Sequence, residues 1–134
     1  MTYAKPLPAP DPSMQPFWEA AKKHKLVVQT CNACGKHHFP PAPSCSNCLS
    51  DDQSWTPTGG HGTLESWIDF HHGYWAGFRE ALPYRVCLVR LDEGPLLISN
   101  LPMDGKEPAL GAGVHAVFDA VTDTVTLPKF ELDE

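Results

Sequence analysis

Four cysteines decide how the first third of this chain folds, and they lie in two pairs ten residues apart: Cys31-Asn32-Ala33-Cys34-Gly35 and Cys45-Ser46-Asn47-Cys48. In each C-x-x-C pair a tight turn directs both sulfurs toward one point, and two facing turns complete a tetrahedron of thiolates. Gly35 supplies the backbone freedom that the first turn requires. The spacing therefore predicts a zinc site whose four positions are filled by protein, which makes its role structural.

Other uses of these cysteines are less consistent with the sequence. Two disulfides would require an oxidising compartment, which nothing else in the sequence indicates. A redox C-x-x-C needs an exposed pair beside a βαβ unit, and no such unit is predicted. His37 and His38 lie next to the first pair, but four cysteines leave them unnecessary as ligands. Iron in the same four sulfurs would support electron transfer and stays open as an alternative.

Length and charge limit the classes of function. The 134 residues suffice for one ordinary domain or two very small ones, and the formal net charge is −6. The charge is uneven, since residues 1–49 carry +3 and residues 50–134 carry −9. An acidic body repels phosphate backbones, so we expect no nucleic-acid partner. The chain has neither an apolar run of roughly 20 residues nor a signal-peptide pattern, so we expect no membrane partner and a cytoplasmic location.

The segment before the cysteines is predicted to contain an extended arm, one helix and one strand. Prolines at every second position from Pro6 to Pro12 favour an extended arm over residues 1–13. Pro16 suits a first helical turn, and residues 17–24 contain good helix formers with lysines at the carboxyl end. Residues 26–30 form a β run that leads into the first cysteine pair.

From Gly62 onward the pattern is that of short strands. In residues 63–70 the alternation places Leu64, Ile68 and Phe70 on one face, with Trp67 on the other. Residues 84–91 are apolar on both faces, as in a central strand. Five short strands without an intervening helical period favour a small barrel. The predicted strands span residues 63–70, 84–91, 96–101, 114–120 and 124–127.

Two features of this barrel region have competing interpretations. Cys87 lies alone on an apolar strand, where a small buried hydrophobe is the favoured interpretation. The alternative is a nucleophile with His71 or His72 as its base. Residues 71–83 form a long loop with three aromatic residues, which either close over the barrel mouth or present an apolar patch to a partner or ligand.

The order of these motifs resembles a family of acyl-CoA-associated proteins that pair a rubredoxin-like zinc ribbon with an OB-fold. The resemblance covers nearly all of the chain after the proline-rich arm. The matching segments are Pro16-Phe17-Trp18, residues 26–34, the pair Cys45 and Cys48, Gly62-Thr63-Leu64, Pro83-Tyr84, residues 89–94, Leu110-Gly111 before Val114, and residues 127–130.

The resemblance implies a mainly β chain: an N-terminal helix and a rubredoxin-like zinc ribbon, then a five-stranded OB-fold barrel. The expected units are the arm at 1–13, the helix with the ribbon at 14–58, and the OB-fold at 59–134. Family members commonly accompany thiolase-like enzymes, so it implies a small non-catalytic subunit in a hetero-oligomer. The large partner would supply the catalytic residues for Claisen or retro-Claisen chemistry or acyl transfer on a CoA thioester.

Under this interpretation no residue of the chain is catalytic, and the zinc ligands are Cys31, Cys34, Cys45 and Cys48. The ribbon, the helix, the long loop and Trp67 supply the candidate contacts with the partner or acyl-CoA. These candidates are Phe17, Trp18, Lys22, Lys23, Lys25, Phe39, Trp67, Tyr74, Trp75, Phe78 and Arg79. A stand-alone acyl-CoA or lipid carrier is the main alternative. A single-strand nucleic-acid module and a rubredoxin-like electron carrier rank below it.

Overall fold

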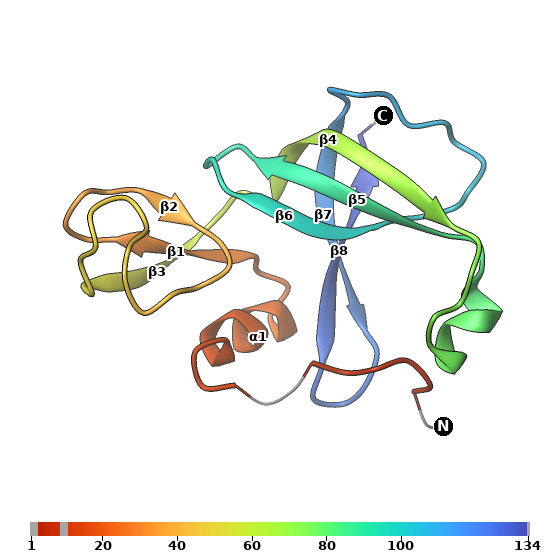
Figure 1. Cartoon of the computed structure of the whole chain (residues 1–134), viewed down its shortest axis with the longest axis horizontal. Helices are drawn as coiled ribbons and strands as arrows, with labels where there is room; N and C mark the ends of the chain where they lie inside the picture. Colours follow the sequence, from red (N-terminus) through yellow and green to blue (C-terminus); the bar gives the residue numbers. More distant parts are fainter. Residues whose placement is uncertain (1–2, 9–10, 134) are drawn as a thin grey trace.

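The chain forms two antiparallel sheets and one short α-helix that packs against both of them (Figure 1). The computed structural model describes residues 3–8 and 11–133. The predicted mainly β fold, with an N-terminal helix followed by a zinc-ribbon unit and an OB-type barrel, is confirmed. The elements in chain order are α1 (Gln15–Lys22), β1 (Val27–Cys31), β2 (His37–His38), β3 (Gln53–Pro57), β4 (His61–Phe70), the 3₁₀ helix η1 (Ala76–Ala81), β5 (Tyr84–Leu91), β6 (Leu96–Leu101), β7 (Gly113–Ala120) and β8 (Thr126–Leu132).

The helix α1 begins with proline in its first turn and buries one face. Phe17 and Ala21 are buried, and Lys22 lies in the last turn, where a cation suits the helix dipole. The Phe17 ring lies edge-on to the Trp18 ring, with 5.0 Å between the ring centroids. Its centroid lies 5.1 Å from that of the Phe39 ring. The same phenylalanine belongs to the main core, so the helix packs against both the ribbon and the barrel.

The smaller sheet has the order β2-β1-β3, with β1 in the centre, and forms the left-hand lobe of Figure 1. Antiparallel pairing sets Gln29 opposite His38 on one side of β1 and opposite Trp55 on the other. Leu26 and Val28 are buried and join the core that the barrel shares. The sheet therefore holds the two cysteine turns at one end and contacts the rest of the molecule at the other.

The larger sheet has the order β6-β5-β4-β7-β8 and curves into a barrel. The central strand β5 lies between β4 and β6, as its apolar sequence predicts. The edge strands meet where the Ser99 hydroxyl donates a 2.9 Å hydrogen bond to the Pro128 carbonyl. Leu64, Val89 and Phe130 are fully buried inside. Hydrophobic burial along alternate residues thus fills the barrel with side chains.

A β-bulge between Leu64 and Ser66 overturns one prediction about β4. Ile68 is 56% exposed, and Trp67 packs against the core in its place. The reason is that one extra residue moves every later side chain of the strand to the opposite face. β8 also extends to Leu132, five residues beyond its predicted end.

Two segments link the barrel to the rest of the chain. The long loop before β5 contains η1, a short helix that the sequence pattern did not predict. The predicted arm over residues 1–13 includes positions 1–2 and 9–10, which lie outside the described residues. Residues 3–5 lie close to η1, and Pro8 lies beside α1 (Figure 1). No helix in the described ranges is both long enough and apolar enough to cross a bilayer.

Candidate metal centre and contact surfaces

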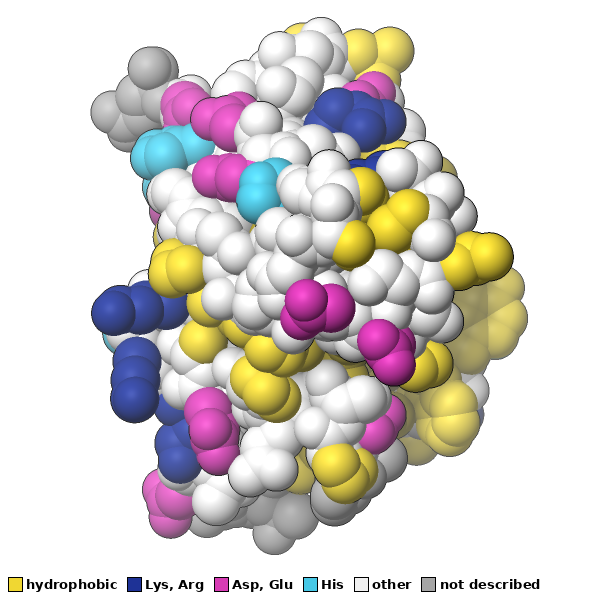
Figure 2. All heavy atoms as spheres, turned by 90° about the vertical axis from the view of Figure 1, so that its left-hand side faces the viewer, with side chains coloured by type: hydrophobic (Ala, Val, Ile, Leu, Met, Phe, Trp, Pro, Cys, Tyr) yellow, Lys and Arg dark blue, Asp and Glu magenta, His cyan; other side chains and the backbone are white. Residues whose placement is uncertain are grey.

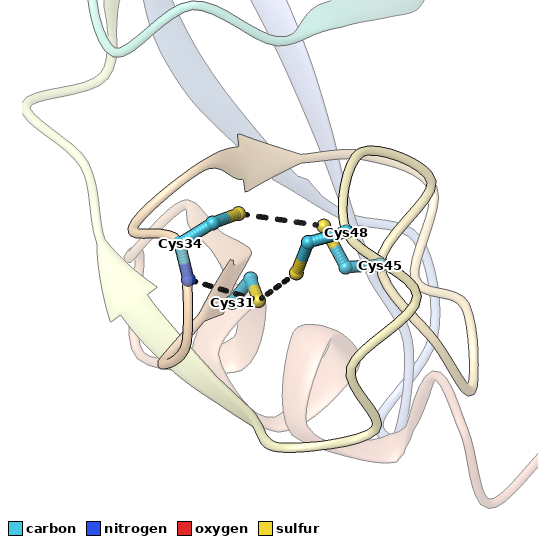
Figure 3. Close-up of side chains that lie close together, drawn as sticks. All are labelled: Cys31, Cys34, Cys45 and Cys48. Carbon is cyan, nitrogen blue, oxygen red and sulfur yellow. Dashed lines mark hydrogen bonds between the residues drawn. The ribbon is translucent and has the colours of Figure 1, made fainter.

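The sulfurs of the four predicted ligands converge at the end of β1 (Figure 3). The Sγ atoms of Cys31 and Cys48 lie 3.5 Å apart, and those of Cys34 and Cys45 lie 3.7 Å apart. All four ligand atoms lie within 4.8 Å of one another. A zinc ion bound tetrahedrally at about 2.3 Å separates its sulfur ligands by about 3.8 Å. The donor set and its spacing therefore fit zinc.

Both cysteine turns have the same backbone pattern. In the first, the Gly35 N–H donates to the Cys31 carbonyl at 2.8 Å; in the second, the Leu49 N–H donates to the Cys45 carbonyl at 2.8 Å. Gly35 has φ +80 and Leu49 has φ +67. The second turn thus places a leucine, 80% exposed, in a backbone region that favours glycine. Its position directly after Cys48 is the signal that could have predicted this conformation.

Backbone hydrogen bonds and neighbouring thiols shift the pKa values of Cys34 and Cys48 in opposite directions. A hydrogen bond from the Lys36 backbone is the main reason that the pKa of Cys34 falls to about 6. A backbone hydrogen bond from Ser50 acts to lower the pKa of Cys48. The neighbouring thiols, led by Cys31, and desolvation oppose it and raise that pKa to about 12. Four thiolates this close repel one another, so a cation is required to hold all of them deprotonated.

The two histidines beside the first pair have other partners. His37 shares a 2.8 Å hydrogen bond with the Thr30 hydroxyl, and His38 shares one of 2.8 Å with the Gln53 side chain. Both therefore hold the small sheet together. This arrangement agrees with the expectation that neither replaces a cysteine at the metal.

The candidate contact residues separate into exposed and packed groups. Figure 2 shows lysine or arginine side chains gathered along the left edge of the face that it presents, at the height of α1. The exposed candidates are Lys22, Lys23, Lys25, Tyr74, Trp75 and Arg79. Trp18, Phe39, Trp67 and Phe78 are half-buried.

Phe17 is the candidate whose expected position the structure corrects. Its side chain is 4% exposed and belongs to the core, because the apolar face of α1 turns toward the ribbon and the barrel. Trp18, Phe39 and Trp67 pack against the same core, so each offers only part of its surface to a partner. Phe17 is therefore a core residue on the apolar face of an amphipathic helix and not a contact for a partner.

Cys87 is a buried, neutral thiol. It is 1% exposed, and burial raises its pKa to about 11. His71 and His72 are exposed, and among the described residues no histidine forms a hydrogen bond with the Cys87 sulfur. A nucleophile needs a thiolate or an adjacent base. The arrangement favours the small buried hydrophobe over the catalytic interpretation.

The barrel also exposes an apolar surface that the sequence reasoning missed. On the outer face of β4, β5 and β6, Ile68 pairs with Val86, and Leu88 pairs with Ile98. Ile68 is 56% exposed and Ile98 is 76% exposed. The signal in the sequence was the β5 strand, whose apolar residues occupy both faces. We call Ile68, Val86, Leu88 and Ile98 the outer sheet patch.

Comparison with known proteins places this fold and site in a family. Residues 18–52 match the model of the rubredoxin-like zinc ribbon domain of ChsH2, and residues 55–119 match that of the ChsH2 C-terminal OB-fold domain. A chain of the solved Ltp2-ChsH2(DUF35) aldolase is 34% identical, with a TM-score of 0.83. The match covers 94% of this chain and 98% of that chain.

Two further relatives extend the comparison. A probable enoyl-CoA hydratase alpha subunit from Thermomonospora curvata is 39% identical over 118 residues, which are 85% of this chain. The chain spans only 36% of that relative. A DUF35-family protein of unknown function from Sulfolobus solfataricus shares the fold, with a TM-score of 0.64 and 17% identity over 91% of this chain and 86% of that one.

The fold and the four-cysteine site thus define a protein of the class that combines a zinc ribbon with an OB-fold. Within this class, the chain belongs to the ChsH2 (DUF35) family.

Proposed function

We propose that this chain is a non-catalytic subunit that binds a thiolase-like partner and supports its acyl-CoA chemistry. That chemistry is the making or cleavage of a carbon–carbon bond by a Claisen or retro-Claisen step, or acyl transfer. The observation that carries the proposal is the match, over nearly the full length of both chains, to a chain of the Ltp2-ChsH2(DUF35) aldolase. A hetero-oligomer is the assembly that this similarity supports.

The chemistry of the described residues supports an accessory role. The one cysteine outside the cluster is buried with a raised pKa, so it lacks the reactivity of a nucleophile. A four-thiolate metal centre has no open position for substrate or water. The partner would therefore supply the reacting groups, and this chain would help the complex to assemble and to admit the acyl-CoA.

We further propose that the four cysteines hold one structural Zn²⁺ ion. When bound, the ion neutralises the thiolates and ties the two turns together. The ribbon needs such a link because its small sheet has few residues with which to build a core. We place the protein in the cytoplasm, where cysteines of this kind stay reduced and available to metal.

Two exposed surfaces are the strongest candidates for contact with the partner. Lys22, Lys23 and Lys25 form a basic group at the end of α1 in an otherwise acidic chain, so they suit CoA phosphates or acidic side chains. The outer sheet patch suits an apolar interface, since aliphatic groups gather there and Ile68 and Ile98 stay exposed in the described part of the chain.

A second candidate function follows from the hydratase relative. Its name describes an enoyl-CoA hydratase alpha subunit, and the present chain corresponds to about a third of it. Under this candidate the chain would be an accessory part of an enoyl-CoA hydratase. The two candidates share acyl-CoA chemistry and differ in the class of catalytic partner.

Affinity purification of the tagged chain from its native cells, with mass spectrometry and metal analysis of the same eluate, tests the proposal. We expect zinc and a thiolase-like protein in near-equal amount. A co-eluting hydratase would favour the second candidate. A chain that elutes alone would contradict both and would favour a stand-alone carrier, which acyl-CoA titration by calorimetry would then test.

Matched variants identify the contact surface within this experiment. Replacing Lys22, Lys23 and Lys25 with glutamate should reduce recovery of the partner, whereas Lys106→Glu, in the exposed loop after β6, should not. Ile98→Ser tests the outer sheet patch in the same way. Unchanged recovery with both sets of variants would exclude these two surfaces as the interface.

A further inference from the structure

A cavity of about 380 Å³ lies beside the N-terminal residues 3–6, where η1 meets the barrel. Tyr3 and Lys5 line it from the arm, and Phe78 lines it from η1. Tyr84 of β5 and Leu127 of β8 line it from the barrel. Segments from both ends of the chain therefore border one space, and none of its lining residues belongs to the four-cysteine cluster.

Aromatic rings form one side of the cavity. Phe78 lies 5.0 Å from Tyr84 between ring centroids, and Tyr84 stacks on Phe70 at 5.1 Å with an interplanar angle of 15°. Because Phe70 supports Tyr84 from behind, the ring positions are fixed by packing. Met103 and Leu127 add aliphatic surface. A flat or branched apolar group would match these walls.

The charged groups of the cavity favour an anion at the arm. Arg85 is paired with Asp69 at 2.6 Å, and Lys129 is paired with Asp119 at 2.7 Å. Glu131 is the carboxylate among the lining residues. Lys5 lies 5.2 Å from the centroid of the Phe78 ring, and no carboxylate of the described residues forms an ion pair with it. Its ammonium group therefore remains available to a ligand.

The arm is fixed over this space by a close backbone contact. A Cβ added at Gly77 of η1 would overlap the carbonyl group of Ala4. Glycine is thus the residue that allows the arm and η1 to approach each other so closely. At Gly73, in the same loop, an added Cβ would lie 3.1 Å from the Arg79 Cγ and 3.4 Å from the Arg79 Cα, which is a much milder contact than the overlap at Gly77. The two glycines make a matched pair for mutation.

We propose that this arm cavity binds an amphipathic anion, with its apolar or aromatic part against Phe78 and Tyr84 and its anionic group at Lys5. Residues 3–6 flank the bound ligand, and the contact at Gly77 keeps them in place. The ligand class is an apolar group that carries one carboxylate, phosphate or sulfonate. The inference concerns the isolated 134-residue chain, so its test does not depend on whether the proposed partner exists.

Two fluorescent probes that differ by one anionic group test the site. These are 8-anilinonaphthalene-1-sulfonate and the neutral N-phenyl-1-naphthylamine. We expect the 134-residue chain to bind one equivalent of each, and the sulfonate more tightly. Lys5→Gln should weaken sulfonate binding by about tenfold or more, the effect of losing one charge-assisted hydrogen bond, and should leave the neutral probe unchanged.

The arm is tested by stopped-flow dissociation of the same probes. Gly77→Ala should release both probes about tenfold faster, whereas Gly73→Ala should match the original chain. Near-UV circular dichroism of each variant reports whether the barrel packing is intact. The proposal is overturned if neither probe binds, if Lys5→Gln affects both probes equally, or if an intact Gly77→Ala protein releases them at the original rate.

Discussion

At the scale of single residues, the ion pair between Asp69 and Arg85 is the most consequential polar contact in the barrel. The two residues lie opposite each other on β4 and β5, and Arg85 donates to Asp69 through Nε at 2.6 Å and through Nη2 at 3.0 Å. The Arg85 side chain is 8% exposed. A guanidinium group this buried requires its carboxylate, because an unpaired charge in the interior is strongly destabilising.

We therefore predict that Asp69→Asn lowers the free energy of unfolding by about 3 kcal/mol at pH 7. The hydrogen bond to Arg85 holds the pKa of Asp69 below its usual value. The stabilisation is thus complete above the unfolded pKa of about 4 and is lost as the pH falls below it. Urea unfolding of the original chain and of Asp69→Asn between pH 7 and pH 3 should show that the difference in their free energies of unfolding shrinks on acidification. A constant difference would contradict the assignment, and the double variant with Arg85→Met should recover stability.

At the scale of elements, the ribbon is expected to need the proposed zinc ion for its stability, whereas the barrel strands supply most of the hydrophobic core. Its sheet has one two-residue strand and two five-residue strands, and Cys34 and Cys48 lie at the exposed surface. A sheet of this size supplies little hydrophobic stabilisation. The proposed zinc ion would supply it instead, since small zinc domains gain about 10 kcal/mol or more of apparent binding free energy from their metal.

Cys45→Ser is accordingly predicted to abolish zinc binding and to unfold the ribbon loops. Metal analysis should give about one zinc per original chain and almost none per variant, with a lower thermal midpoint. Cys87→Ala is the matched control, since it removes a buried thiol outside the cluster and should retain the metal. Iron instead of zinc would favour electron transfer. Full zinc retention by Cys45→Ser would show that the cluster is not the binding site.

At the scale of the whole molecule, one hydrophobic core connects units that the sequence separates. Phe17 of α1, Val28 of β1 and Phe130 of β8 belong to the same buried cluster. His24, directly after the helix, stacks on Phe118 of β7 with ring centroids 5.3 Å apart. The ribbon and the barrel are therefore expected to unfold together, because each covers apolar surface of the other.

Phe17→Ala should remove this coupling. The cavity left by the ring is expected to cost about 3–5 kcal/mol. In urea, tryptophan fluorescence and far-UV circular dichroism should report one transition in the original chain and separated transitions in the variant. Tyr74→Ala, at a side chain that is 73% exposed, should change stability by less than about 0.5 kcal/mol. Coincident transitions in Phe17→Ala would indicate that other contacts carry the coupling.

The sequence by itself determined the features that depend on neighbouring residues. The two C-x-x-C pairs predicted the cluster of Cys31, Cys34, Cys45 and Cys48, because ligand spacing follows from a local turn. The position of Pro16 predicted the start of α1. Alternation and composition predicted the barrel strands, since a strand's burial pattern is written into successive residues.

Only the tertiary structure decided which side chains face inward and which segments meet. The bulge in β4 exposed Ile68 and half-buried Trp67, and the packing of α1 placed Phe17 in the core rather than at a contact surface. The approach of the arm to Gly77 joins residues that are more than seventy positions apart. Such features depend on the register and docking of whole elements, which are set by contacts between distant residues that no local pattern specifies.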